Sequence, residues 1–330
     1  MTLPSVELAS GDAVAARALR LVDDGAVDRH GVDGVAKKVG VSPRHVLRAV
    51  EAIADCGPLD LARAGRVRLA RLLLTTTAIP MRDVAVAAGF SSVRQFNSTI
   101  MAMYRCTPGT IRFGLRRVVI AEREPGPLVV RCVLALPQLV GAGVFAAMAE
   151  RLIPEVEEGT DRWFARTVRL PRGAGHMRVD LDAAGRLHAK LTCTDLRDFA
   201  PLMYRVEQLF TAPASAAPAP VDVAVRPTSG ATDMSESLIR AMVERHSSAH
   251  SGRTVLGGLV SALGEITPWG LLFPTARAIA DEGRTVLRGP TSRVDSVMHA
   301  AQAIADGVID VDAGWSRAAL MARHSAVLAV

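Results

Sequence analysis

Seven polar side chains near the amino end are spaced so that they could contact nucleic-acid bases and phosphates. Arginine pairs with guanine, asparagine and glutamine pair with adenine, and serine contacts are less selective. Both groups lie opposite apolar residues at helical spacing. For any one of these side chains, the alternative is a solvated helix face. The candidates are Arg44, His45 and Arg48 in the first group, and Arg94, Gln95, Asn97 and Ser98 in the second.

A repeated turn pattern precedes each group. Residues 36–42 read A-K-K-V-G-V-S, and residues 85–92 read A-V-A-A-G-F-S-S. In each copy a small Ala permits close packing of a second helix, a Gly permits a left-handed turn, and a Ser caps the next helix. The pattern predicts two helix-turn-helix units.

The second helix of each unit is expected over residues 43–52 and 93–103. Ser42 and Ser92 are the predicted caps, and Ser92 with Gln95 forms an S-x-x-Q pattern typical of a capping box. This register turns one apolar pair of each helix toward its own core. The pairs are Val46 with Val50 in the first unit and Phe96 with Ile100 in the second.

A single connecting helix is predicted between the units, over residues 58–76. A rigid connector that spaces the two recognition helices by about one turn of DNA, roughly 34 Å, would let one chain read successive major grooves. The basic residues along this stretch are Arg63, Arg66, Arg68 and Arg71.

The positive charge is concentrated in the same part of the chain. Residues 1–117 hold 17 Lys and Arg against 10 Asp and Glu, whereas residues 118–330 hold 22 against 23. A basic segment attracts a polyanion such as DNA. Only three of the 39 basic residues are lysines, and an arginine bias of this strength is also explained by genome composition.

The first third resembles the AraC-type double helix-turn-helix domain, in the version found in bacterial Ada/AlkA adaptive-response proteins. The resemblance rests on GVAKKVGVSPRHVLRAV, GPLDLARAGRVRLARLLL and IPMRDVAVAAGFSSVRQFNSTIMAMYRCTPGTIR, and it covers most of residues 10–117. It implies binding to promoter DNA and control of transcription. RNA polymerase is a further candidate partner of such a regulator.

From residue 126 to 210 the pattern changes to strands and helices, which suggests an α+β layer. The phrase Trp163-Phe164-Ala165-Arg166 resembles one in the N-terminal domain of AlkA-type 3-methyladenine DNA glycosylases. Residues 211–220, TAPASAAPAP, have a linker composition. The segment from 235 onward is expected to be mostly helical and is similar to the early helices of the glycosylase helix-hairpin-helix domain.

The catalytic half of that family is not recognisable. We expect its DNA-anchoring hairpin and its essential Asp to be missing, because the sequence reaches MARHSAVLAV where the hairpin would start, and residues 242–248 depart from the family's cleft-lining segment. Without that Asp the cationic transition state of base release lacks its electrostatic partner. The remaining carboxylates on the early helices, Asp295, Asp306 and Asp310, are expected to be solvated.

Metal and thiol chemistry are not indicated either. Cys56, Cys106, Cys132 and Cys193 lie far apart, without His at ligand spacing, so neither zinc nor a disulfide framework is predicted. Neither Cys56 nor Cys106 has neighbours that would activate a thiolate. Reduced thiols and the lack of a signal sequence at the amino end favour a cytoplasmic location, and no cofactor is expected.

One apolar stretch, residues 128–149, is long enough to span a bilayer. Arg131, Gln138, Pro137 and a glycine pair interrupt it, and its first half is β-branched. A strand followed by a short buried helix is the better prediction, and no membrane is expected as a partner.

These observations predict a mainly α protein with an α+β middle domain. The expected parts are a DNA-binding domain over 1–117, an α+β domain over 126–210, a linker over 211–234 and a truncated glycosylase-like helical domain over 235–330. We predict a regulator of double-stranded DNA targets that is not an enzyme; the alternative is an alkylation-repair glycosylase or repair accessory. A further possibility is an effector pocket lined by Trp269, Phe273 and Trp315, for which plain core packing is the alternative.

Overall fold

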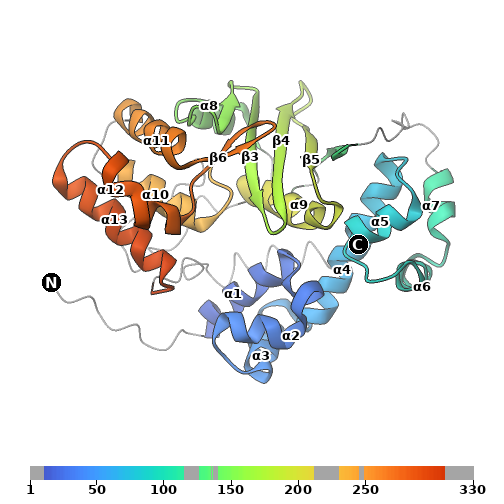
Figure 1. Ribbon diagram of the computed structural model, residues 1–330. Coiled ribbons are helices and arrows are strands. Elements are labelled where there is room, and N and C mark those ends of the chain that lie inside the picture. The colour runs from blue at the N-terminus through green and yellow to red at the C-terminus, as the bar shows by residue number, and fades with distance from the viewer. Residues whose placement is uncertain are drawn as a thin grey trace.

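The computed structural model describes residues 11–114, 126–134, 136, 140–211, 230–244 and 249–308. The described chain is mainly helical with one α+β layer in its middle, which confirms the predicted fold class (Figure 1). The amino-terminal part is all helical. Its helices are α1 (Gly11–Asp23), α2 (Ala26–Val39), α3 (Pro43–Ala54), α4 (Pro58–Thr76), α5 (Met81–Ala87), α6 (Val93–Tyr104) and α7 (Pro108–Gly114).

The middle part is an antiparallel sheet with the strand order β1-β5-β4-β3-β2. Helix α9 lies against its buried face, where Phe199, Leu202 and Val206 join Val168 and Met177 in one apolar cluster. The elements are β1 (Leu128–Val133), α8 (Ala142–Ala149), β2 (Glu157–Gly159), β3 (Trp163–Leu170), β4 (Gly173–Leu181), β5 (Leu187–Cys193), the 3-10 turn η1 (Leu196–Asp198) and α9 (Phe199–Thr211).

The strand-then-helix interpretation of the long apolar stretch is correct, since β1 and α8 occupy its two halves. Within the described ranges, no helix has both the length and the apolarity needed to cross a bilayer.

The last part is helical except for a small hairpin that the sequence pattern did not reveal. The Oγ1 of Thr167 on β3 donates to the Leu271 carbonyl at 2.5 Å, and the Leu271 amide donates to the Glu155 carbonyl at 2.8 Å. These bonds dock the hairpin on the sheet. The elements are α10 (Met234–Glu244), α11 (Ala249–Leu263), β6 (Glu265–Thr267), β7 (Gly270–Leu272), α12 (Ala276–Val286) and α13 (Thr291–Ala305).

Helix α4 contributes to two hydrophobic cores. Leu61 and Ala62 near its start pack in the cluster of α1 to α3, whereas Leu73 and Leu74 near its end belong to the cluster that contains both the second unit and the sheet. The guanidinium of Arg68 on α4 also makes two hydrogen bonds to the Glu207 carboxylate on α9, at 2.5 and 3.1 Å. The second unit and the sheet are therefore packed together as one body.

A buried ion network joins the sheet to the last helices. Arg166 on β3 contacts Glu157 at 3.2 Å and Glu236 on α10 at 2.9 Å, and Arg240 contacts the same two carboxylates. All four side chains are at most 3% exposed. Burial alone would raise the pKa of Glu236, but the guanidinium groups of Arg166 and Arg240 hold it below its ordinary value.

Candidate nucleic-acid interface

The turn between the helices of each unit is closed in the same way. Gly40 and Gly89 have φ of 81° and 88°, a left-handed conformation that favours glycine. The residue after each glycine then donates its amide to the carbonyl of the repeat's Ala. Val41 N lies 3.1 Å from Ala36 O, and Phe90 N lies 2.9 Å from Ala85 O. Both units thus end their first helix with a Schellman-type closure.

The predicted serine caps begin both recognition helices. The Oγ of Ser42 accepts from the His45 amide at 3.3 Å, and the Oγ of Ser92 accepts from the Gln95 amide at 3.1 Å. The reciprocal half of the predicted capping box is wrong. The Oε1 of Gln95 accepts from the amide and hydroxyl of Ser91, at 3.1 and 2.9 Å, because the longer second turn places an additional serine within its reach.

The repeat extends beyond the predicted turn motif to the ends of both recognition helices. Both recognition helices end at a non-glycine residue with positive φ, Asp55 at 54° and Arg105 at 55°. Each is followed by a cysteine, one intervening residue and a proline that starts the next helix, so D-C-G-P matches R-C-T-P fifty residues later. That constant offset was the signal available in the sequence.

The predicted inward-facing pairs are correct. Val46, Val50, Phe96 and Ile100 are each fully buried. Helices α3 and α6 extend two and one residues further, respectively, than the spacing predicted.

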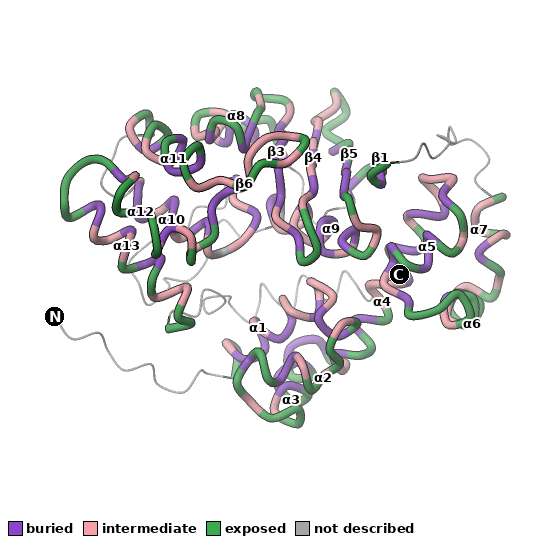
Figure 2. Tube along the Cα trace, viewed as in Figure 1, coloured by how far each residue is buried: buried purple, intermediate pink, exposed green. Residues whose placement is uncertain are grey.

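The candidate DNA-contacting side chains lie on the other face of each helix. Figure 2 shows exposed residues along the outer sides of α3 and α6. The structure gathers them into two sets, one on each helix. Arg44, Arg48, Arg94, Asn97 and Ser98 are exposed, whereas His45 and Gln95 are half-buried.

Hydrogen bonding separates these candidates further. Ser98 Oγ donates to the Gln95 carbonyl at 3.0 Å, so part of its capacity is used locally. Across the described ranges, Arg44, Arg48 and Arg94 have no side-chain ion pair or hydrogen bond within the chain. Three guanidinium groups are therefore available to an external anion.

The arginines of α4 have a different role. Arg66 binds Asp28 at 2.7 Å and lies over the Phe90 ring, Arg68 binds Glu207, and the Arg71 guanidinium lies 5.7 Å from the centroid of the Tyr104 ring. These contacts fasten α4 to its neighbours in the fold. Arg63 stays exposed, 3.7 Å from Asp60.

Two of the three carboxylates expected to be solvated lie on the described C-terminal helices. Asp295 pairs with Arg284 at 2.7 Å, and Asp306 pairs with Arg277 at 3.0 Å; both carboxylates are at least 40% exposed, as predicted for solvated residues. Asp310 lies outside the described residues.

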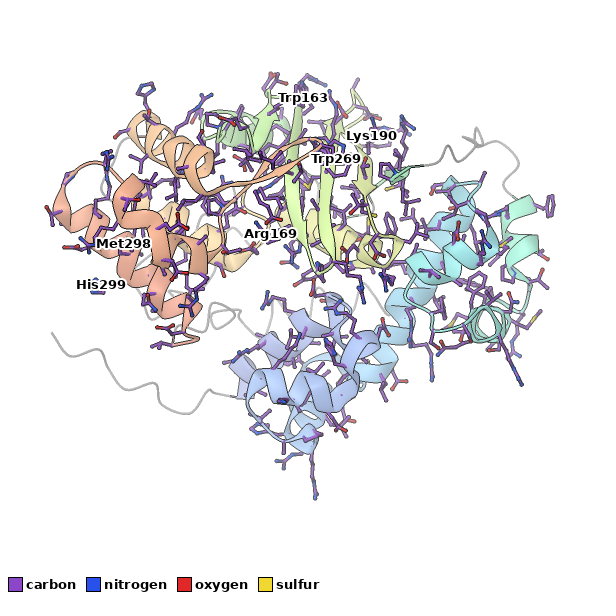
Figure 3. All side chains as sticks on the ribbon, in the orientation of Figure 1. Trp163, Arg169, Lys190, Trp269, Met298 and His299 are labelled. Carbon is purple, nitrogen blue, oxygen red and sulfur yellow. The ribbon has the colours of Figure 1, made fainter. Side chains whose placement is uncertain are left out.

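Of the three aromatic residues of the expected pocket, Trp269 and Phe273 are described, and Trp269 does not line the cavity that Phe273 lines. The Trp269 ring is 6.2 Å from that of His176 on β4, and Figure 3 shows Trp269 beside the sheet. Phe273 lines a cavity whose other walls include the carboxyl end of β3. Trp315 lies outside the described residues.

The thiols of the sheet are held protonated. Burial raises the pKa of Cys132 to about 11 and that of Cys193 to about 12. Burial, with nearby carboxylates, also raises the pKa of Cys56. Over the described residues, no cluster of His, Cys, Asp and Glu could hold a metal ion.

The turns, caps and repeated register define a protein with a double helix-turn-helix domain. Comparison with known families supports this definition: a helix-turn-helix domain matches residues 35–113, and the AlkA N-terminal domain matches residues 137–227. The chain therefore carries an AraC-type helix-turn-helix domain followed by an AlkA N-terminal domain.

Two curated relatives from strains of Mycobacterium tuberculosis bear the name "Probable bifunctional transcriptional activator/DNA repair enzyme AlkA". They are 33% identical over an alignment of 326 positions, which covers 92% of this chain and 65% of theirs. The chain thus spans about two thirds of the length of these relatives.

The HTH-type transcriptional regulator GlxA of Rhizobium meliloti is 37% identical over 78 residues, covering 24% of each chain. The crystal structure of a transcriptional regulator with an AraC-type DNA-binding domain, from Chromobacterium violaceum, is 27% identical and covers 32% of this chain and 93% of its own, with a TM-score of 0.28.

Proposed function

We propose that the chain is a sequence-specific transcription regulator that binds double-stranded DNA through α3 and α6. The observation that carries the proposal is the pair of capped helices that follow the same turn and expose guanidinium groups without partners in the described chain. Because α4 holds the two units together, one chain would contact two successive major grooves. The cytoplasm is the location that such a role requires.

We further propose that the glycosylase-like part acts as a sensory or interaction module. Asp295 and Asp306 are both used in surface ion pairs, which is consistent with a part that does not use them for base release. A small-molecule effector and RNA polymerase would be the partners of such a regulator. The second candidate function is alkylation repair, which the printed name of the M. tuberculosis relatives favours. Release of a base from an alkylated duplex by the purified chain would establish repair activity.

The operator is found by sequencing genomic fragments that the purified protein retains. Fluorescence anisotropy then tests Arg94→Ala on that operator. We expect a loss of about 1–3 kcal/mol in binding free energy and a relaxed sequence preference, because a bidentate contact to a base is removed.

Arg253→Ala is the matched control, since Arg253 is an exposed arginine on α11, outside the helix-turn-helix domain. Equal affinity of wild type and Arg94→Ala for the operator would refute the proposed contact.

A further inference from the structure

A cavity of about 650 Å³ lies where the three parts of the described chain meet. One wall comes from α1 and α2, and a second comes from β3, its following turn and α9. A third comes from α10 and the start of α12. Leu170, Ile239 and Phe273 supply apolar surface. The volume falls within the range of about 300–1,000 Å³ that is typical of small-molecule sites.

The charge of the lining is strongly positive. Seven Lys or Arg side chains line the cavity against three Asp or Glu side chains. Those carboxylates are already used: Asp24 Oδ2 accepts from Arg29 at 3.0 Å and its Oδ1 lies 3.8 Å from Arg205, Asp233 accepts from the Glu236 amide at 2.8 Å, and Glu236 belongs to the buried ion network. The cations of the lining therefore outnumber its carboxylates, while Glu157, Glu265 and Asp198 outside the lining pair with Arg166, Arg169 and Arg172.

Three cations at the rim could bind an incoming anion. Lys38 is exposed and, within the described ranges, has no ion pair. Arg172 is 27% exposed and lies 3.6 Å from Asp198. Arg169, which Figure 3 places between the sheet and the C-terminal helices, pairs at 2.6 Å with an outward, 65% exposed Glu265. Guanidinium and ammonium groups in this arrangement suit phosphate oxygens.

We propose that this cavity binds a small phosphorylated organic anion of mononucleotide size. Its phosphate lies among the Lys38, Arg169 and Arg172 side chains, and its organic part lies on the apolar wall. Figure 1 shows α1 on the side of the first unit that faces the sheet and α3 on the far side, so DNA bound along α3 does not enter the cavity.

The occupant would contact the first helix-turn-helix unit and both following parts at once. Binding that favours one arrangement of these parts shifts the DNA-binding equilibrium by its differential affinity for the two states. This regulatory consequence rests on the proposed function, whereas the binding itself does not.

Isothermal titration calorimetry of the full chain tests the proposal. AMP and inorganic phosphate are the probes, the ionic strength is fixed, and no DNA is present. We expect one AMP site that Lys38→Ala and Arg172→Gln each weaken by about tenfold or more, because each removes a charge-assisted bond. Lys37→Ala and Arg186→Gln are the matched controls: both residues are exposed and neither lines the cavity. They should keep wild-type affinity, and thermal melts verify that all four variants fold.

Absence of AMP binding, or an equal loss in Lys37→Ala, would overturn the proposal. If inorganic phosphate bound as tightly as AMP, the proposed contact between the organic part of the ligand and the apolar wall would be wrong. Loss of operator affinity in Lys38→Ala but not Lys37→Ala, without AMP binding, would mark a DNA contact instead and would also overturn it. Since the titration contains no DNA, failure to find an operator leaves its result unaffected.

Discussion

At the scale of single residues, Phe96 shows how one side chain supports the second recognition helix. It is fully buried and meets Phe90 edge to face, with ring centroids 5.4 Å apart and planes at 65°. The Arg66 guanidinium lies 5.6 Å from the centroid of the Phe90 ring, and Arg66 in turn binds Asp28 of the first unit. The aromatic pair therefore connects α6 to α4 and, through Arg66, to α2.

Phe96→Ala should lower the free energy of unfolding by about 3–5 kcal/mol, because it removes a buried ring and leaves a cavity. Urea denaturation followed by circular dichroism measures the change. Phe113→Ala is the control, since Phe113 is 68% exposed and its ring has little to lose. Similar losses in the two variants would contradict the packing described for Phe96.

At the scale of elements, the turns of the two units can be compared directly through their glycines. Gly40→Ala should cost about 1–2 kcal/mol, the price of a left-handed conformation for a residue with a Cβ. At Gly40 a Cβ would have open space, so the backbone alone sets the effect. At Gly89 the Cβ would also lie 3.0 Å from an Asp28 oxygen, and we expect a larger loss in Gly89→Ala.

Gly65→Ala provides the opposite control. Gly65 is inside α4, where a Cβ meets nothing within 4 Å, so alanine should stabilise the protein by about 0.5–1 kcal/mol. Thermal unfolding of the three glycine variants ranks them by stability. A Gly40→Ala variant as stable as wild type would mean that the turn adopts another conformation in solution.

The sequence was sufficient to predict these elements because their signals are local. Glycine, serine and proline mark the turns, the caps and the start of α4, and the bounds predicted for α4 agree with the structure. The β6–β7 hairpin was not predictable, since its strands are three residues long and are held by Thr167 and Glu155, which lie far away in sequence. The cavity was not predictable for the same reason, because its lining residues come from three separate parts of the chain.

At the scale of the whole molecule, the buried ion network links the sheet to the C-terminal helices. Glu236→Gln should lower the free energy of unfolding by about 3–5 kcal/mol, because it leaves the Arg166 and Arg240 guanidinium groups incompletely compensated in a dry interface. Asp295→Asn breaks an exposed pair and should cost about 0–1 kcal/mol. Urea unfolding of both variants measures the difference between the two losses in unfolding free energy.

The network also predicts a pH dependence. Since the pKa of Glu236 is lowered in the folded protein, its stabilising contribution is present above the ordinary carboxyl pKa of 4.5 and is lost as the pH falls below it. Wild type should therefore lose more stability than Glu236→Gln on acidification. An equal acid dependence of the two proteins would show that this carboxylate is not charged in the fold.

The division of α4 between two apolar clusters affects the order in which parts of the protein unfold. Residues near Leu61 lose their packing when α1 to α3 open, whereas residues near Leu73 remain protected as long as the sheet persists. The seam between cooperative unfolding units then falls inside a continuous helix. The first helix-turn-helix unit can thus unfold locally by itself, whereas the second unit unfolds together with the sheet.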